Sequence, residues 1–381
     1  MAATTPAPTA TTAPPAARPR GFDVLRIVAA CAVVVSHAHQ LPFGDRDTQP
    51  DLLVFGDFAF NLGRVGVIVF FIVSGYLVCG SWLSEPRVRP FAAKRARRLM
   101  PGLLVMLVLV VFVLGPLTTT APDYFSTAGT WEYLVRNALV FPYANHLPGV
   151  FSGNPSTMVN GVLWTLGVEV LAYALLGFAG WRGWVSPRHL IAITAVLAVL
   201  GWRLVSENVA GGQLVPVALR LELIAYFFAA AAVRAWGWRP TGRAAIAAAA
   251  VVALLVAVQA PLSIALVPCA TVVVLHLGTR TWAWARPVTA LGDPTYGAYI
   301  YGFVAQQLLI AHLGMRDAPV WWFATASVVA ALACGYASWH LVEKRALRRR
   351  TGGRRRPHGG PAGATATTTA TTTVTAADTG R

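Results

Sequence analysis

Residues 21–40 read GFDVLRIVAACAVVVSHAHQ, a mostly apolar run that contains Arg26 and His37. About 20 such residues are enough to cross the hydrocarbon core of a membrane as a helix. A chain inside a bilayer must satisfy its backbone hydrogen bonds internally, and a single helix does so. The stretch therefore predicts a first membrane-spanning helix over residues 22–41.

Apolar segments of similar length recur along the rest of the chain. The predicted spans cover residues 22–41, 62–83, 100–117, 161–180, 189–206, 216–236, 243–259, 262–280, 293–313 and 319–341. We therefore predict an all-α fold, a polytopic transmembrane helical bundle of about ten spans.

The composition excludes other classes of protein. Of the 381 residues, 56% are hydrophobic and 12% are charged, whereas a soluble domain carries roughly 25% charged residues. A disordered chain would be poor in apolar residues and rich in charge. The formal net charge is +16, but the basic residues form short clusters between apolar runs, so we expect membrane lipids and no nucleic acid as partners.

The basic residues predict the orientation of the chain in the membrane. Most of the 31 Lys and Arg residues fall in every second connection, as the positive-inside rule requires when both termini are cytoplasmic. The domain organisation expected is a disordered tail over 1–20, a transmembrane domain over 21–342 and a basic, disordered cytoplasmic tail over 343–381. The long loop 118–160 then lies outside, and the expected location is the inner, cytoplasmic membrane.

Arg26 and His37 are candidate functional residues of the first span. Eleven residues at 100° each come within about 20° of three full turns, so both point to one face, about 16 Å apart along the axis. Asp23 lies three residues before Arg26 and is placed to pair with it. An ionisable group at membrane depth costs on the order of 3 kcal/mol and by default faces the bundle interior. The alternatives are snorkelling for the arginine and a packing hydrogen bond for the histidine.

Two further segments are candidates for donor binding. The second span carries Ser74 among glycines, and such small residues allow a helix or a ligand to approach closely. The segment that follows contains Lys94, Arg95 and Arg98, and an arginine pair at helical spacing suits phosphate recognition. Ordinary cytoplasmic charge is the alternative explanation of the basic segment.

Glu169 lies in the fourth predicted span, about 12 Å below its outer end and at a depth comparable with His37. A carboxylate and an imidazole at this depth could form a His–Glu pair in which His37 acts as a general base. The alternative is a structural carboxylate paired with Arg203 or Arg220. Metal ligation is not expected, because no three donor side chains recur at ligand spacing.

Several segments together resemble the integral-membrane acyltransferase family three, most closely its polysaccharide and lipopolysaccharide O-acetyltransferase branch. The matching segments are FDVLRIVAACAVVVSH, VGVIVFFIVSGYLV, KRARRLMP, LPGVFSGNPSTMVNGVLWTLGVE, LGDPTYGAYIYGFVAQQL and SWHLVEKRAL, in the order of the family and spread over residues 21–347. The sequence departs from the branch at Gly167, Val168 and Arg345, which leaves the acceptor open.

The resemblance implies an acyl-CoA donor, usually acetyl-CoA, that is bound from the cytoplasm as a co-substrate and not as a permanent cofactor. It implies transfer to a hydroxyl group, often on an extracytoplasmic glycan. Arg26 and His37 match the family's Arg-x10-His pair, and Glu169 matches its glutamate. Arg95 and Arg98 match its RxxR motif.

The residues and the resemblance predict an O-acetyltransferase in which His37 is a general base or transiently carries the acyl group. An antibiotic or another secondary metabolite is an alternative acceptor. A glycan transporter is a weaker alternative, because transporters usually show internal repeats and this chain shows none. A non-catalytic membrane sensor would leave Arg26, His37 and Glu169 unexplained. The sequence gives no indication of the oligomeric state.

Overall fold

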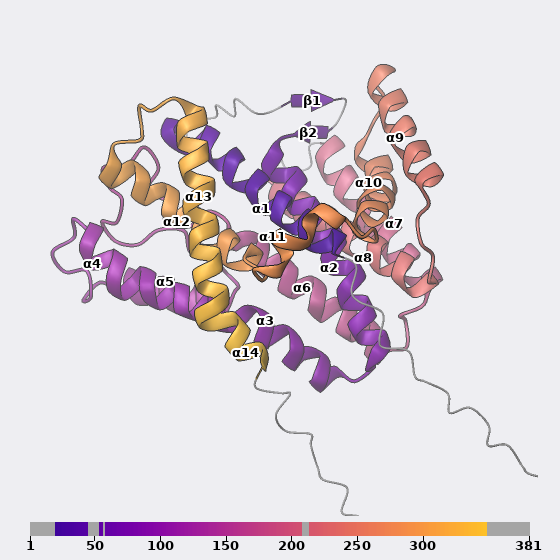
Figure 1. Cartoon of the computed structure of the whole chain (residues 1–381), viewed down its shortest axis with the longest axis horizontal. Coiled ribbons are helices and arrows are strands. Elements are labelled where there is room, and N and C mark those ends of the chain that lie inside the picture. The colour runs from indigo at the N-terminus through magenta and orange to yellow at the C-terminus, as the bar shows by residue number, and fades with distance from the viewer. Residues whose placement is uncertain (1–19, 45–52, 56–57, 208–212, 349–381) are drawn as a thin grey trace, which may run out of the picture. The chain divides into compact units, whose positions relative to one another are not determined.

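The computed structural model describes residues 20–44, 53–55, 58–207 and 213–348. The predicted tails 1–20 and 343–381 therefore lie largely outside the described residues. Within the described part, the segments up to Leu347 form one compact unit of packed helices (Figure 1).

Every predicted span coincides with a helix, which confirms the all-α class. The long helices are α1 (Gly21–Gln40), α2 (Leu62–Ser84), α3 (Val88–Leu109), α6 (Leu163–Trp181), α7 (Pro187–Ser206), α8 (Val215–Trp236), α9 (Gly242–Ala257), α10 (Ser263–Gly278), α12 (Thr295–Leu313) and α13 (Val320–Ser338).

Shorter elements connect or extend these helices. They are the 3-10 turns η1 (Leu41–Phe43) and η4 (Ala283–Ala285), the π-helical turns η2 (Val110–Leu114) and η5 (Trp339–Glu343), the short helices α4 (Gly115–Thr118), α5 (Ala128–Ala138), α11 (Arg286–Ala290) and α14 (Lys344–Arg348), and the strands β1 (Leu53–Phe55) and β2 (Phe58–Phe60). The two strands pair antiparallel, with Leu53 opposite Phe60.

Seven helical segments in the described part are long and apolar enough to cross a membrane. They cover Gly21–Phe43, Leu62–Ser84, Val88–Thr118, Leu163–Trp181, Pro187–Ser206, Val215–Trp236 and Val320–Arg348. Helices α9 and α10 have 16 residues each and are shorter, and α12 is not among the seven. The protein is therefore multi-pass, whereas ten spans and cytoplasmic termini stay predictions.

Three predicted boundaries differ from the structure. The basic segment is no loop but the first turns of α3, which begins at Val88 and continues through η2 and α4 to Thr118. The predicted outer loop contains the helix α5, and Tyr124 anchors this region by donating to the carbonyl of Val111 at 3.0 Å. The predicted C-terminal tail starts too early, because Glu343 is buried and α14 follows it.

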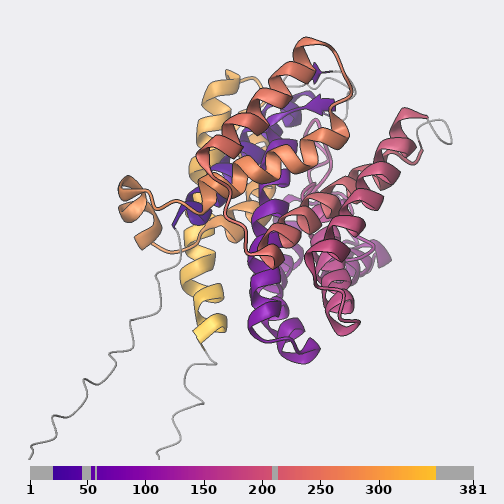
Figure 2. The ribbon, with the colours of Figure 1, turned by 90° about the vertical axis from the view of Figure 1, so that its right-hand side faces the viewer.

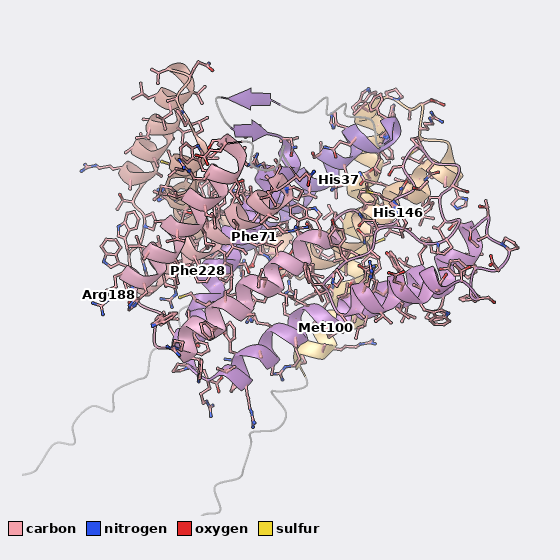
Figure 3. The ribbon with its side chains drawn as sticks, turned by 180° about the vertical axis from the view of Figure 1, so that it is seen from behind. His37, Phe71, Met100, His146, Arg188 and Phe228 are labelled. Carbon is pink, nitrogen blue, oxygen red and sulfur yellow. The ribbon has the colours of Figure 1, made fainter. Side chains whose placement is uncertain are left out.

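Helix α2 packs between α1 and α8 through its small residues. A Cβ atom on Gly66 would lie 2.6 Å from the carbonyl oxygen of Ala29, and one on Gly75 would lie 2.1 Å from that of Phe227. Both glycines thus allow close helix contact, as small residues do in membrane bundles. Phe71 and Phe228 fill the centre of the bundle (Figure 3).

The remaining helices pack as neighbouring pairs. Helix α7 packs on α8, and α12 packs on α13. Helices α9 and α10 lie side by side as a hairpin (Figure 2), and α10 connects this hairpin to α1, α2 and α8. Antiparallel neighbours joined by short connections are the usual arrangement of a helical bundle.

We expect Gly75→Ala to lower the thermal stability of the detergent-solubilised protein by the equivalent of about 1–3 kcal/mol, the usual cost of overpacking. The added methyl group would collide with the backbone of α8. Gly177→Ala in α6 is the control, because its Cβ atom would meet only a Phe91 ring atom at 3.4 Å. Equal melting temperatures for the two variants would contradict this account of α2 packing.

Candidate active site

A shared carboxylate joins three segments near the N-terminal end of α1. Arg26 Nη1 lies 2.6 Å from Asp293 Oδ2, and Arg98 Nη2 lies 2.7 Å from the same oxygen. The other oxygen of Asp293 accepts a hydrogen bond of 2.5 Å from the Thr295 hydroxyl. Asp293, two residues before the start of α12, is thereby tied to α1 and α3.

Arg98 also binds a second carboxylate. Its Nη1 lies 3.1 Å from Glu343 Oε2, and the Ser338 hydroxyl donates to Glu343 Oε1 at 2.9 Å. The positive charges of Arg26 and Arg98 compensate the negative charge of Asp293. Both terminal nitrogens of Arg98, Nη1 and Nη2, therefore bind acidic side chains.

The partner of Arg26 differs from the one expected. The charge of Asp23 acts on Arg26, but the hydrogen-bonded ion pair is formed with Asp293. The two partners are 267 residues apart in the chain, so local helical spacing could not identify them. The sequence signal is the segment LGDPTYGAYIYGFVAQQL, which contributes to the family resemblance, although no local pattern indicates a role for its aspartate.

Glu169 accepts hydrogen bonds from two hydroxyl groups. Ser74 Oγ lies 3.2 Å from Glu169 Oε1, and the Tyr173 hydroxyl donates to the same oxygen. The hydroxyl oxygens of Ser74 and Tyr173 lie 3.0 Å apart and also form a hydrogen bond. The hydrogen bonds of this carboxylate thus go to Ser74 and Tyr173 and not to the expected His37.

The two basic side chains expected beside Arg98 have different surroundings. Lys94 lies 2.9 Å from Glu85, and hydrogen bonds from Lys94 and Arg87 lower the pKa of Glu85 to about 2. Arg95 stacks its guanidinium over the Tyr173 ring at 5.8 Å. Its Nε atom is buried and has no hydrogen-bond partner among the residues described.

Arg203, which was expected as an alternative partner of Glu169, binds a different carboxylate. Arg203 forms an exposed ion pair of 2.7 Å with Glu207 on its own helix, α7. The structural alternative for Glu169 therefore does not hold for Arg203.

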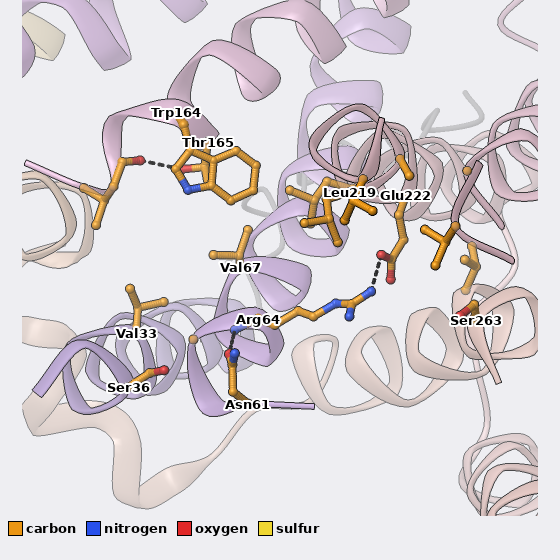
Figure 4. Close-up of a pocket in the computed structure, with 18 of the residues that line it drawn as sticks. Val33, Ser36, Asn61, Arg64, Val67, Trp164, Thr165, Leu219, Glu222 and Ser263 are labelled. Carbon is orange, nitrogen blue, oxygen red and sulfur yellow. Dashed lines mark hydrogen bonds and ion pairs between the residues drawn. The ribbon is translucent and has the colours of Figure 1, made fainter. Parts of the chain in front are cut away.

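His37 lies in the half of the bundle that carries the β1–β2 hairpin, whereas Met100 of α3 lies in the other half (Figure 3). Its ring meets Phe303 edge-on, with ring centroids 5.1 Å apart. His37 also lines a cavity of about 560 Å³ between α1, α2, α6, α7, α8 and α10 (Figure 4). Cavities of roughly 300–1,000 Å³ are the usual size of small-molecule sites.

Helix α12 connects the cavity with the arginine cluster. Tyr299 lines the cavity and hydrogen-bonds to Thr165. One turn earlier, Tyr296 lies under the guanidinium of Arg98 at 5.8 Å. Tyr296, Tyr299 and Phe303 follow each other at spacings of three and four residues and therefore share one face of the helix.

Polar side chains thus occur in both halves of the bundle, and α12 contributes Tyr299 to one group and Tyr296 to the other. We call them the polar row: His37, Thr165, Tyr299, Glu169, Ser74, Tyr173, Arg95, Tyr296, Arg26, Asp293, Arg98 and Glu343. Charged groups inside a membrane bundle are costly unless paired, and they mark functional paths.

The comparison with protein families agrees with this geometry. The profile of acyltransferase family three, described as an acyltransferase domain, matches residues 20–340. This is most of the chain, so the protein belongs to that family. No solved structure matches the chain at a significant level.

Three curated proteins are similar to the chain. The O-acetyl transferase of Shigella phage Sf6 is 30% identical over 341 residues, which cover 86% of this chain and 96% of that protein. Nodulation protein 10 of Rhizobium leguminosarum bv. viciae is 28% identical, and the match covers 87% of this chain and 94% of that protein. The peptidoglycan O-acetyltransferase OatA of Listeria monocytogenes is 29% identical over 157 residues, which cover 36% of this chain and 23% of that protein. The chain is accordingly a multi-pass membrane acyltransferase of the O-acetyltransferase kind.

We expect Arg98→Gln to reduce thermal stability in detergent by about 3 kcal/mol, because a buried carboxylate then loses its cation. The double variant Arg98→Gln/Glu343→Gln should recover part of the loss. Arg203→Gln, which breaks an exposed pair, should cost less than about 1 kcal/mol. A double variant as unstable as the sum of its single changes would show that the pair is not coupled.

Proposed function

We propose that this enzyme moves an acetyl group from cytoplasmic acetyl-CoA to a hydroxyl group of an extracytoplasmic or membrane-associated glycan, in the inner membrane. The observation that supports this proposal most directly is the polar row. It contains Arg95, whose buried Nε atom has no hydrogen-bond partner among the described residues, and it reaches His37 in the cavity wall. A donor and an acceptor from two aqueous compartments can meet along such a path.

The names of the relatives support a glycan as the acceptor class. The Listeria relative is named as a peptidoglycan O-acetyltransferase, and peptidoglycan is a glycan polymer outside the cytoplasmic membrane. A hydroxyl-bearing glycan also suits the cavity beside His37, which combines an imidazole with hydrogen-bonding groups such as Ser36 and Gln40.

Arg95 is the arginine that we assign to the donor. CoA carries phosphates, and an arginine binds them with charge-assisted hydrogen bonds. Arg98 is engaged by Asp293 and Glu343, and Lys94 by Glu85. We therefore give Arg98 a positioning role, in place of the equal phosphate roles expected for Arg95 and Arg98.

In the proposed reaction His37 takes the proton of the acceptor hydroxyl, and the oxygen attacks the thioester carbonyl. The new C–O ester bond forms, the C–S bond breaks, and the proton ends on the thiol of CoA. Glu169 is a positioning residue, since it holds the hydroxyl groups of Ser74 and Tyr173 and its charge acts on Arg26. Transient acylation of His37 would give the same products in two steps.

We expect His37→Ala to lower acetyl transfer by at least about 100-fold, the usual contribution of a general base. The measurement is transfer of label from radioactive acetyl-CoA to the envelope glycans of membrane vesicles. Glu169→Gln should reduce turnover more than protein abundance. Unchanged transfer in His37→Ala would contradict the role of His37 in the reaction.

We expect Arg95→Gln to weaken acetyl-CoA binding about tenfold, because a phosphate loses one charge-assisted hydrogen bond. Arg97→Gln is the matched control, since Arg97 lies two residues further along α3 and donates to the carbonyl of Ala93 at 3.0 Å. Titration calorimetry of the purified protein gives both affinities. Equal affinities would remove Arg95 from the donor site.

The acceptor itself can be identified in cells. Mass spectrometry of surface glycans should show the loss of one acetyl group per modified sugar when the gene is deleted, and its return with the wild-type gene but not with His37→Ala. Intact glycan acetylation in the deletion strain would contradict a glycan acceptor.

A further inference from the structure

The cavity beside His37 contains an ion pair that the reaction described above does not use. Arg64 Nη2 lies 2.5 Å from Glu222 Oε2, and both side chains belong to the cavity wall (Figure 4). The exposed fractions are 21% for Arg64 and 13% for Glu222. The two residues come from α2 and α8 and are 158 positions apart, so the tertiary fold creates the pair.

The position of this pair is well defined. Arg64 lies in the first turn of α2, where its backbone N–H donates to the Asn61 side chain at 2.7 Å. This cap uses the backbone of Arg64, so a change of its side chain leaves the cap intact. Glu222 projects from α8, the helix that packs closely on α2 at Gly75.

The rest of the cavity wall is mostly apolar. Helices α7 and α8 contribute side chains such as Ala198, Trp202 and Leu219, and α6 contributes Trp164. In such sites a few polar groups orient the ligand, while apolar and aromatic surfaces supply contact area. Arg64 and Glu222 are therefore placed to select among polar groups that enter beside His37.

The pair discriminates by charge. As an ion pair it is neutral overall, and a neutral polyol can accept a hydrogen bond from Arg64 and donate one to Glu222 without separating them. An anionic group would approach a carboxylate inside a poorly hydrated wall, where like charges repel strongly. Specificity of this kind comes from rejecting the wrong ligand as well as from binding the right one.

We propose that this cavity is the acceptor subsite and that the Arg64–Glu222 pair selects an uncharged sugar over an anionic one. The inference rests on the proposed function, because it assigns the acceptor to the cavity that contains His37. It adds the chemical class of the sugar unit and two specificity-determining residues.

The test uses two probes that differ in one group, methyl α-glucopyranoside and its C6 carboxylate, methyl α-glucuronide. The full-length protein in lipid nanodiscs is titrated with each probe by calorimetry, without acetyl-CoA. We expect the wild type to bind the neutral probe about tenfold more tightly, the effect of one charged interaction. Equal binding of the two probes, or no binding of the neutral one, would overturn the proposal.

Variants separate a selective role from a structural one. Glu222→Gln removes the carboxylate that lies against Arg64, so the preference for the neutral probe should disappear or invert. The double variant Arg64→Gln/Glu222→Gln removes both charges, so its preference should lie between those of the wild type and of Glu222→Gln. The matched control is Glu207→Gln, which removes a carboxylate from the exposed Arg203–Glu207 pair outside the cavity wall and should keep the wild-type ratio.

Two outcomes would contradict the assignment of this pair: an unchanged preference in Glu222→Gln, or the same shift in Glu207→Gln. If Glu222→Gln fails to fold, Arg64→Gln provides a second test, in which the preference between the two probes should change in the opposite direction. It removes the guanidinium that lies against Glu222, so rejection of the glucuronide should become stronger, and a weaker rejection would overturn the proposal.

The proposed function and the assignment of the acceptor subsite can be tested independently of each other. Sugar binding is measured without donor, so a shift of preference in Glu222→Gln supports the subsite even if His37→Ala keeps its acetyl transfer, which would contradict only the proposed function. Normal acetyl transfer together with an unchanged preference would contradict only this inference.

Discussion

Asp293 is the carboxylate on which the arrangement of this bundle depends. Two arginines from different helices share one of its oxygens, and an unpaired charge in a membrane bundle would be costly. The pairing can be satisfied only if α1, α3 and the start of α12 meet at this point. The same contact orients α1, and the orientation of α1 determines where His37 lies about 16 Å further along the helix.

From this contact α12 extends to the cavity and supplies a side chain at each turn. Tyr296 lies against Arg98, Tyr299 bonds to Thr165, and Phe303 meets the ring of His37. One helix therefore supports both ends of the proposed path between donor and acceptor. The close contacts of α2, at Gly66 and Gly75, place α1 and α8 on its two sides and so bring Glu222 to Arg64.

Two arginines that look equivalent in the sequence have different surroundings. Arg95 and Arg98 share a helix and a basic segment, yet Arg98 is enclosed by two carboxylates, while Arg95 has a buried nitrogen without a hydrogen-bond partner in the described part of the chain. Three residues rotate a side chain by about 300° around the helix, so Arg95 and Arg98 point in directions that differ by about 60°. Only the neighbouring helices decide which groups each arginine contacts. The relatives agree with the enzyme class, and the roles proposed for the residues rest on these contacts.

The sequence by itself determined the class, the positions of the helices and the face shared by Arg26 and His37, because apolar run length and helical periodicity are local properties. It also led to the family through short segments. Only the tertiary structure decided which charges pair. Asp293, and not Asp23, binds Arg26, and Glu169 binds Ser74 and Tyr173. Glu169 and Tyr173 lie four residues apart on α6, but Ser74 and Asp293 come from other segments. Their distances to Glu169 and Arg26 depend on packing, which no local pattern encodes.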